Sequence, residues 1–222
     1  PVWHDDQQGT ATVILAGLIN AFKIVGKKSK ESIITLVGAG SANIRTAYVL
    51  IKWGIKPGNI MLADTKGVIH GGRKDITKEE DPWKYDLAQR TNAEGRTGDI
   101  PVAFKSVDAV VAASTPQPGT IKKEWIATMA DKAIVFACAN PLPEIWPWDA
   151  EEAGARIVAT GRSDFPNQVN NSLGFPAIFR GVLDVRAKTV TDDMCIAAAQ
   201  ELAKFAEERG MHEGDILPRM VE

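Results

Sequence analysis

The sequence has no excess of basic residues, because its 26 lysines and arginines are set against 28 aspartates and glutamates, for a formal net charge of -2. Proteins that bind nucleic acid usually carry a basic patch, so this composition gives no support for a nucleic-acid partner. Charge or glycine interrupts the apolar runs before they reach the length of a membrane span, and no charged-then-apolar leader is recognisable. We therefore expect a cytoplasmic protein that works without a membrane.

Residues that carry redox or metal chemistry are also scarce. The two cysteines, Cys138 and Cys195, lie in apolar stretches far apart in the sequence, which favours reduced thiols in the core. The three histidines, His4, His70 and His212, lack the spacing of metal ligands, and there is neither a Cys/His nucleophile pair nor an internal repeat. With 222 residues, 45% of them hydrophobic, the chain is long enough for a complete core.

The strongest pattern in the sequence is a βαβ unit over residues 32–64. A short run of β-branched apolar residues, 33–37, predicts a strand that is buried on both faces of a parallel sheet. The sequence GAGSAN (38–43) then opens a helix whose apolar spacing continues to Gly54. A second apolar strand follows and ends at Asp64. This order of elements is typical of a dinucleotide-binding fold.

Each part of this unit suits a nicotinamide or flavin dinucleotide. Gly38 and Gly40 would let backbone amides approach a pyrophosphate. The helix start at Ser41 and Ala42 would supply the positive end of a helix dipole. Asp64 lies where a carboxylate accepts hydrogen bonds from the adenosine ribose. The alternative is a tight strand-to-helix turn whose glycines serve geometry alone.

Two features leave the fit and the choice of cofactor open. Asn43 occupies the position of a third glycine, which normally permits close packing of helix on strand. Lys66, Arg73 and Lys74 lie where a 2′-phosphate would be bound, yet they are equally ordinary surface charges, so NAD and NADP both stay open. They belong to a long connection, residues 65–99, that contains a short helix and is otherwise expected to be a solvated loop.

Three further apolar runs, 108–113, 133–139 and 155–160, predict the remaining parallel strands. The first ends at Ser114 and the second at Asn140, so small polar residues recur at the strand ends where ligands bind in open α/β folds. The predicted fold class is therefore α/β, with a doubly wound parallel sheet of the Rossmann type that binds NAD(P).

Amides follow the last predicted strand in a dense cluster of Asn167, Gln168, Asn170 and Asn171. Amides both donate and accept hydrogen bonds, so this cluster suits a carboxamide or a carboxylate ligand. The alternative is a set of caps and Asx turns, and Asn140 is open to the same two interpretations.

A long apolar helix is expected after residue 10, ending at Gly26 and packing beneath the sheet. Asp5 and Asp6 come shortly before it. Their carboxylates either cap the helix N-terminus or form a polar wall for a divalent cation or a substrate.

Four motifs together give the sequence a family resemblance. They are PVWHDDQQGTA at the start, VGAGSAN at the glycine turn, FACANPLPEI, and VATGRSDFPNQVNNSLGFPAIFRG. They resemble the NAD(P)-binding domain of malic enzymes, in the short prokaryotic and archaeal form, over essentially all 222 residues. The resemblance implies oxidative decarboxylation of L-malate to pyruvate and carbon dioxide, with NAD or NADP reduced, Mg2+ or Mn2+ bound, and a homo-oligomeric assembly.

The resemblance also implies a role for each matching residue. Asp6 matches a metal ligand, and Asp5 matches an acid that supports the catalytic lysine. Asn140 and Asn171 match amides that hold the substrate carboxylate. The cofactor-binding residues that it implies are Thr10, Gly38, Gly40, Ser41, Ala42, Asp64, Ala113, Ser114 and Asn170.

The family's catalytic tyrosine, lysine and Glu-Asp metal pair are absent from this chain, and Tyr48 and Tyr85 match neither catalytic role. We therefore expect residues 1–222 to be one NAD(P)-binding domain, with residues 1–10 at the boundary to an N-terminal malic domain. Alone it should bind cofactor but turn over little or no substrate. The alternatives are the cofactor domain of another dehydrogenase, of the amino-acid dehydrogenase type, and a non-catalytic nucleotide-binding or assembly domain.

Overall fold

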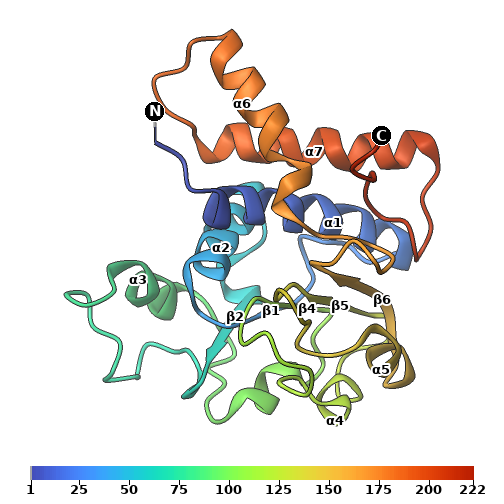
Figure 1. The fold of residues 1–222 in the computed structure, drawn as a ribbon. Helices are drawn as coiled ribbons and strands as arrows, with labels where there is room; N and C mark the ends of the chain where they lie inside the picture. The colour runs from blue at the N-terminus through green and yellow to red at the C-terminus, as the bar shows by residue number, and fades with distance from the viewer. Residues whose placement is uncertain (1) are drawn as a thin grey trace.

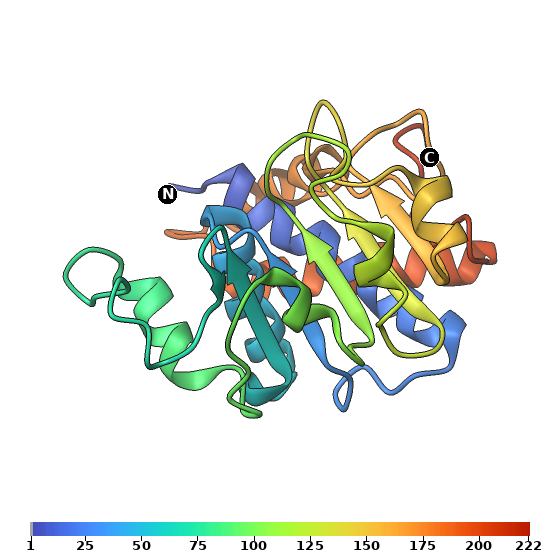
Figure 2. The same ribbon diagram turned by 90° about the horizontal axis from the view of Figure 1, so that it is seen from below.

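The computed structural model of the protein describes residues 2–222 and is built on a six-stranded sheet with the order β3-β2-β1-β4-β5-β6. The strands are β1 (Ile34–Val37), β2 (Ile60–Asp64), β3 (Gly67–Val68), β4 (Ala109–Ala112), β5 (Ala133–Ala137) and β6 (Ala155–Thr160). All neighbours pair in parallel except β3, which runs antiparallel to β2 at the edge. Figure 2 shows β2, β4 and β6 pointing the same way. The predicted doubly wound sheet is confirmed.

Helices cover both faces of the sheet (Figure 1). The α-helices are α1 (Thr10–Val25), α2 (Ser41–Trp53), α3 (Pro82–Arg90), α4 (Lys123–Ile126), α5 (Pro147–Glu152), α6 (Phe175–Asp184) and α7 (Asp192–Arg209), with short turns at η1 (Asp5–Gly9), η2 (Pro57–Asn59), η3 (Ile100–Phe104) and η4 (Asn171–Leu173). One apolar cluster joins α1, α2 and α7 to the sheet, and a second joins α4 and α5 to its other face. Strands with both faces covered in this way are nearly continuous apolar runs.

Helix α1 is buried almost all round because it lies between the sheet and α7 (Figure 1). A Cβ on Gly17 would lie 2.9 Å from the ring of Phe136, so the helix packs directly on β5. By length and composition the helix over Asp5–Val25 could cross a membrane, which the expectation about interrupted apolar runs did not foresee. However, 78% of its most apolar window is buried inside this domain, as in the core helix of a globular fold.

The connection between β2 and β4 is better ordered than a solvated loop, so that part of the expectation is wrong. Its first residues form β3, whose Gly67 pairs with Asp64 at the edge of the sheet. Val68, Ile69 and Leu87 are buried. Strand β3 is too short to show a pattern in the sequence, and the predicted helix within the connection is present as α3 beside β2 (Figure 2).

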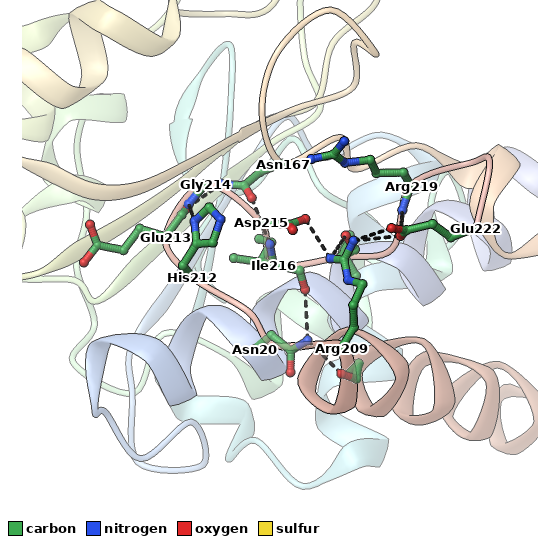
Figure 3. Close-up of polar contacts among 12 residues, drawn as sticks. Asn20, Asn167, Arg209, His212, Glu213, Gly214, Asp215, Ile216, Arg219 and Glu222 are labelled. Atoms are coloured by element: carbon green, nitrogen blue, oxygen red, sulfur yellow. Dashed lines mark hydrogen bonds and ion pairs between the residues drawn. The ribbon is translucent and has the colours of Figure 1, made fainter.

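The last residues, 210–222, form a segment that we call the C-terminal strap, and polar contacts hold it to the domain (Figure 3). Arg209 donates to Asp215 at 2.8 Å. Asn20 of α1 is fully buried and donates to the carbonyl oxygens of Ala203 and Ile216, each at 2.9 Å. Asn20 therefore joins α1, α7 and the strap.

Both cysteines are free, and neither forms a disulfide within the described residues. Burial is the main cause that raises the pKa of each thiol. Thiols that stay protonated are poor nucleophiles, so the expectation of inert core thiols is consistent with their surroundings.

Candidate functional site

The glycine turn lies between β1 and α2 at the carboxyl edge of the sheet. Gly38 has a φ of 90°, and a Cβ there would lie 2.4 Å from the carbonyl oxygen of Ala113. Gly38 is therefore required by both the backbone conformation and the close approach of the β4 loop. A Cβ on Gly40 would meet no atom within 4 Å, and the start of α2 has no side-chain cap. The start of α2 is thus uncapped and borders open space at Gly40, as an anion site requires.

Asn43 takes the place of a third glycine without opening the turn. Its side chain is fully buried, and its Nδ2 donates to the carbonyl oxygen of Val37 at 2.8 Å. This hydrogen bond ties the first turn of α2 to the end of β1. The close packing that a glycine normally permits is therefore achieved here through a buried amide.

Asp64 ends β2 beside the same turn. Its Oδ1 accepts from Arg73 Nη1 at 2.7 Å and from the Lys66 amide at 2.9 Å. Lys84 Nζ is 3.9 Å from Oδ2, which leaves that oxygen able to accept from a sugar hydroxyl. Arg73 also donates to both carboxylate oxygens of Asp75. Its hydrogen bonds, followed by one from Lys66, hold the pKa of Asp75 well below its usual range.

A cavity of about 610 Å³ joins these residues into one site. It is lined by the glycine turn, by Asp64, and by Ala113 and Ser114 at the end of β4. Because β1 and β4 are parallel neighbours, their carboxyl ends meet at this edge. Ser41 lines a second, smaller cavity of about 260 Å³ that also borders Gly40. Ala42 lies in the same helical turn and is half-buried.

The second part of the site lies at the ends of β5 and β6. Asn140 is exposed and precedes a cis peptide bond to Pro141. A Cβ on Gly161 would lie 2.7 Å from Asn140 Nδ2, so a glycine lets the two loops approach this closely. Asn170 donates to the carbonyl oxygen of Gly161 at 3.1 Å. The structure therefore brings Asn140 and Asn170 together around one glycine.

Asp5 and Asn171 are also in contact, 166 positions apart in sequence, through a short hydrogen bond of 2.5 Å from Nδ2 of Asn171 to Oδ2 of Asp5. The Oδ1 of Asp5 is buried and has no hydrogen-bond partner among the described residues. Burial and then the charge of Asp6 raise the pKa of Asp5, while Asn171 opposes the shift. Neither aspartate makes a side-chain cap, since helical structure begins at Asp5 itself, so the capping interpretation is wrong.

The amide cluster over residues 167–171 contains both structural amides and amides that face the candidate site. Asn167 is structural: it donates to Val158 and Glu213 and accepts from the Ile216 amide, which holds the C-terminal strap (Figure 3). Asn170 caps η4 by accepting from the Ser172 amide at 3.0 Å, although its Nδ2 points to the β6 loop.

Thr10 begins α1, and its Oγ1 is 3.5 Å from the carbonyl oxygen of Asp5. It therefore lies with the Asp5–Asn171 pair and does not line the 610 Å³ cavity. Asn170 is likewise outside that cavity. Of the residues implied for the cofactor, Gly38, Gly40, Asp64, Ala113 and Ser114 line the 610 Å³ cavity. Ser41 lines the smaller one, and Ala42, Thr10 and Asn170 line neither.

The described residues of this chain do not form a complete metal-binding site. In the part of the chain that the structure describes, no three His, Cys, Asp or Glu side chains are grouped to hold one. Asp6 is exposed and could provide one carboxylate. Magnesium requires an octahedral set of oxygen ligands, so the others would have to come from elsewhere.

Glu144 is a site residue that the sequence analysis did not single out. Its side chain is fully buried between the loop after β4 and the loop after β5. Its Oε1 accepts from the Ser114 amide at 2.8 Å, and its Oε2 accepts from the Ala139 amide at 3.1 Å. The available signal was a glutamate inside the apolar, proline-rich sequence FACANPLPEI, where a solvated carboxylate is not expected.

Comparison with known proteins gives a consistent result. Residues 7–222 match the family described as "Malic enzyme, NAD binding domain". The chain is 45% identical over 209 residues to the NADP-dependent malic enzyme of Halomonas elongata, covering 94% of this chain and 47% of that protein. It is 44% identical over 218 residues to the NAD-dependent malic enzyme of Geobacillus stearothermophilus, covering 98% of this chain and 44% of that protein.

A solved structure agrees with these sequence matches. The crystal structure of Entamoeba histolytica malic enzyme has a TM-score of 0.96 and 50% identity, covering 100% of this chain and 46% of that one. The chain thus spans about half the length of these relatives or slightly less.

Proposed function

The chain belongs to the malic enzyme family as its NAD-binding domain, and on this premise we propose that it is the cofactor domain of an enzyme that converts L-malate to pyruvate and carbon dioxide. The observation that carries the proposal is the unfilled space at Gly40, next to the uncapped start of α2 and to Asp64. Together they suit the pyrophosphate and ribose of a dinucleotide. The family match decides against the amino-acid dehydrogenase alternative.

In this proposal a bound NAD or NADP would supply the hydride acceptor for malate oxidation. The amides of the first turn of α2 bind the pyrophosphate, and Asp64 accepts from the adenosine ribose. Asn140 and Asn171 would orient the substrate carboxylate, and the hydrogen bond from Asn171 to Asp5 places one of these amides beside the proposed acidic residues. The unpartnered Oδ1 of Asp5 is suited to accept a hydrogen bond from a lysine supplied outside the described residues.

We infer that the general acid, the base and most metal ligands belong to the half of the relatives' length that this chain does not span, with residues 1–10 at the boundary. Tyr48 does not substitute for the acid, because its hydroxyl donates to Asp86 at 2.8 Å. Burial, followed by that hydrogen bond, raises the pKa of Tyr48. Asp6 would contribute one ligand to Mg2+ or Mn2+.

Because these catalytic roles are inferred to lie outside this chain, the chain alone should be inactive. The purified 222-residue chain is expected to bind NAD but to show no malate-dependent NAD reduction in the presence of Mn2+, because residues 2–222 group no three metal-ligating side chains and the general base is inferred to lie outside this chain. Absorbance of the reduced nicotinamide measures this directly. Ready turnover by the chain alone would overturn the assignment of the missing roles, whereas failure to bind NAD would overturn the proposed cofactor domain.

The geometry around Asp64 favours NAD over NADP. A 2′-phosphate would meet the carboxylates of Asp64 and Asp75 at the cavity wall. Arg73, the cation best suited to bind such a phosphate, is already paired with both acids, and its side chain is only 8% exposed. Lys66 and Lys84 also line this cavity, but Lys66 Nζ pairs with Asp75 at 3.0 Å and Lys84 Nζ lies 3.9 Å from Asp64, so each already faces a carboxylate. No free guanidinium is left to bind a 2′-phosphate.

Calorimetry with both cofactors tests this preference. The wild-type chain is expected to bind NAD at least about tenfold more tightly than NADP. Asp64→Ala should weaken NAD binding by about tenfold, since a ribose acceptor is lost, and should leave NADP binding unchanged or tighter. Asp131→Ala, at an exposed turn before β5, is the matched control and should change neither. Equal affinities in the wild type would contradict the preference.

A further inference from the structure

Glu144 is a buried acid with an unusual set of partners. It lies in the loop after β5, and its side chain is fully buried. Among residues 2–222 it forms no ion pair with lysine, arginine or histidine. Burial of a carboxylate is unfavourable unless hydrogen bonds compensate for the lost water, so the contacts of Glu144 determine whether it can be held there.

Those contacts all belong to two loops. Oε1 accepts from the backbone amide of Ser114 at 2.8 Å and from its hydroxyl at 3.0 Å. Oε2 accepts from the backbone amide of Ala139 at 3.1 Å. The main-chain oxygen of Glu144 accepts from the amides of Gly119 and Ile121, at 3.0 and 3.1 Å. One residue therefore connects the loop after β4 with the loop after β5.

Both connected positions adjoin the proposed site. Ser114 lines the 610 Å³ cavity, and Ala139 directly precedes Asn140. We propose that Glu144 is a positioning residue that fixes the cofactor-facing β4 loop and the substrate-facing β5 loop relative to each other. The inference rests on the proposed function, since it takes Ser114 to face the nicotinamide ribose and Asn140 to face the substrate.

A carboxylate is needed because each of its two oxygens accepts from a backbone N–H. Glutamine has the same shape but offers one acceptor oxygen and one NH2 donor. In the Glu144→Gln variant, one of the two amides would face a donor and lose its hydrogen bond. Burial raises the pKa of Glu144, and the hydrogen bonds from Ser114 and Ala139 act in the opposite direction.

The test compares two ligands in the same chain. ADP occupies only the adenosine and pyrophosphate part of the site, whereas NAD also reaches the β4 loop. Glu144→Gln is expected to weaken NAD binding by about tenfold and to change ADP binding by less than about twofold. Amide hydrogen exchange at Ser114 or Ala139 should become faster by about tenfold, while exchange in β1 stays unchanged. Glu152→Gln, at the exposed end of α5, is the matched control and should match the wild type in every measurement.

The outcomes separate this inference from the proposed function. If the Gln variant loses NAD and ADP binding equally and exchange rises throughout the sheet, Glu144 maintains the fold and the positioning role is wrong. If both affinities and both exchange rates are unchanged, the role is wrong as well. If the wild type binds neither ligand, the proposed function fails, and exchange at Ser114 and Ala139 still decides whether Glu144 couples the loops.

Discussion

Gly40→Asp is expected to weaken NAD binding by at least about 100-fold while leaving the chain folded. A Cβ added at Gly40 meets no atom within 4 Å, so a side chain there would extend into the space that the pyrophosphate needs. Two like charges about 4 Å apart near a protein surface repel by roughly 4 kcal/mol, enough for such a loss. Gly40 is also the N-cap of α2 with extended φ and ψ, where aspartate is favoured, so stability should stay the same or rise by up to about 1 kcal/mol.

Gly38→Ala is the comparison variant, because it adds a side chain at a glycine of the same turn that the fold itself requires. Its Cβ would lie 2.4 Å from the Ala113 carbonyl oxygen, on a backbone with φ of 90°. We expect a loss of more than about 2 kcal/mol in the free energy of unfolding, measured by urea titration. Calorimetry of both variants completes the test. NAD binding by Gly40→Asp that equals the wild type would place the pyrophosphate elsewhere.

The parts of the fold that follow from local pattern could be predicted from the sequence. Strands buried on both faces are nearly continuous apolar runs of about four to eight residues, and β1, β4 and β5 fit this pattern with Thr35 as their one polar residue. The parallel order then places their carboxyl ends at one edge. The grouping of Gly38, Gly40, Asp64 and Ser114 around one cavity follows from that order and is present.

What could not be predicted depends on contacts between distant residues. The pairing of Arg73 with Asp64 decides whether the guanidinium is free for a phosphate, and the charges alone do not reveal it. Asn167 and Asn171 look alike in sequence, yet one binds the C-terminal strap and the other binds Asp5. Glu144 shows the same limit, because its role depends on amides of Ser114 and Ala139 that only the folded sheet brings together.

Asn20→Ala is expected to lower the free energy of unfolding by about 3 kcal/mol, or the melting temperature by roughly 6–12 °C. Asn20 is fully buried, and its Nδ2 is the donor to the carbonyl oxygens of Ala203 and Ile216 (Figure 3). Removing the donor leaves both oxygens buried without this partner. Because Ile216 also donates to Asn167, the C-terminal strap should exchange its amide hydrogens faster in this variant.

Two further variants separate the hydrogen bonds from simple packing. Asn20→Leu restores most of the side-chain volume without the donor, so it should be about as unstable as Asn20→Ala if the hydrogen bonds dominate, and close to the wild type if the cavity dominates. Asn59→Ala removes a similar amide-to-carbonyl bond, to Glu31 at 3.1 Å, from an exposed position and should cost less than about 1 kcal/mol. Equal losses at Asn20 and Asn59 would show that burial does not amplify this contact. A large loss in the free energy of unfolding at Asn20 alone would show that one buried amide holds α1, α7 and the C-terminal strap together. The strap in turn contacts Asn167, which precedes the proposed site residues Asn170 and Asn171 in the sequence.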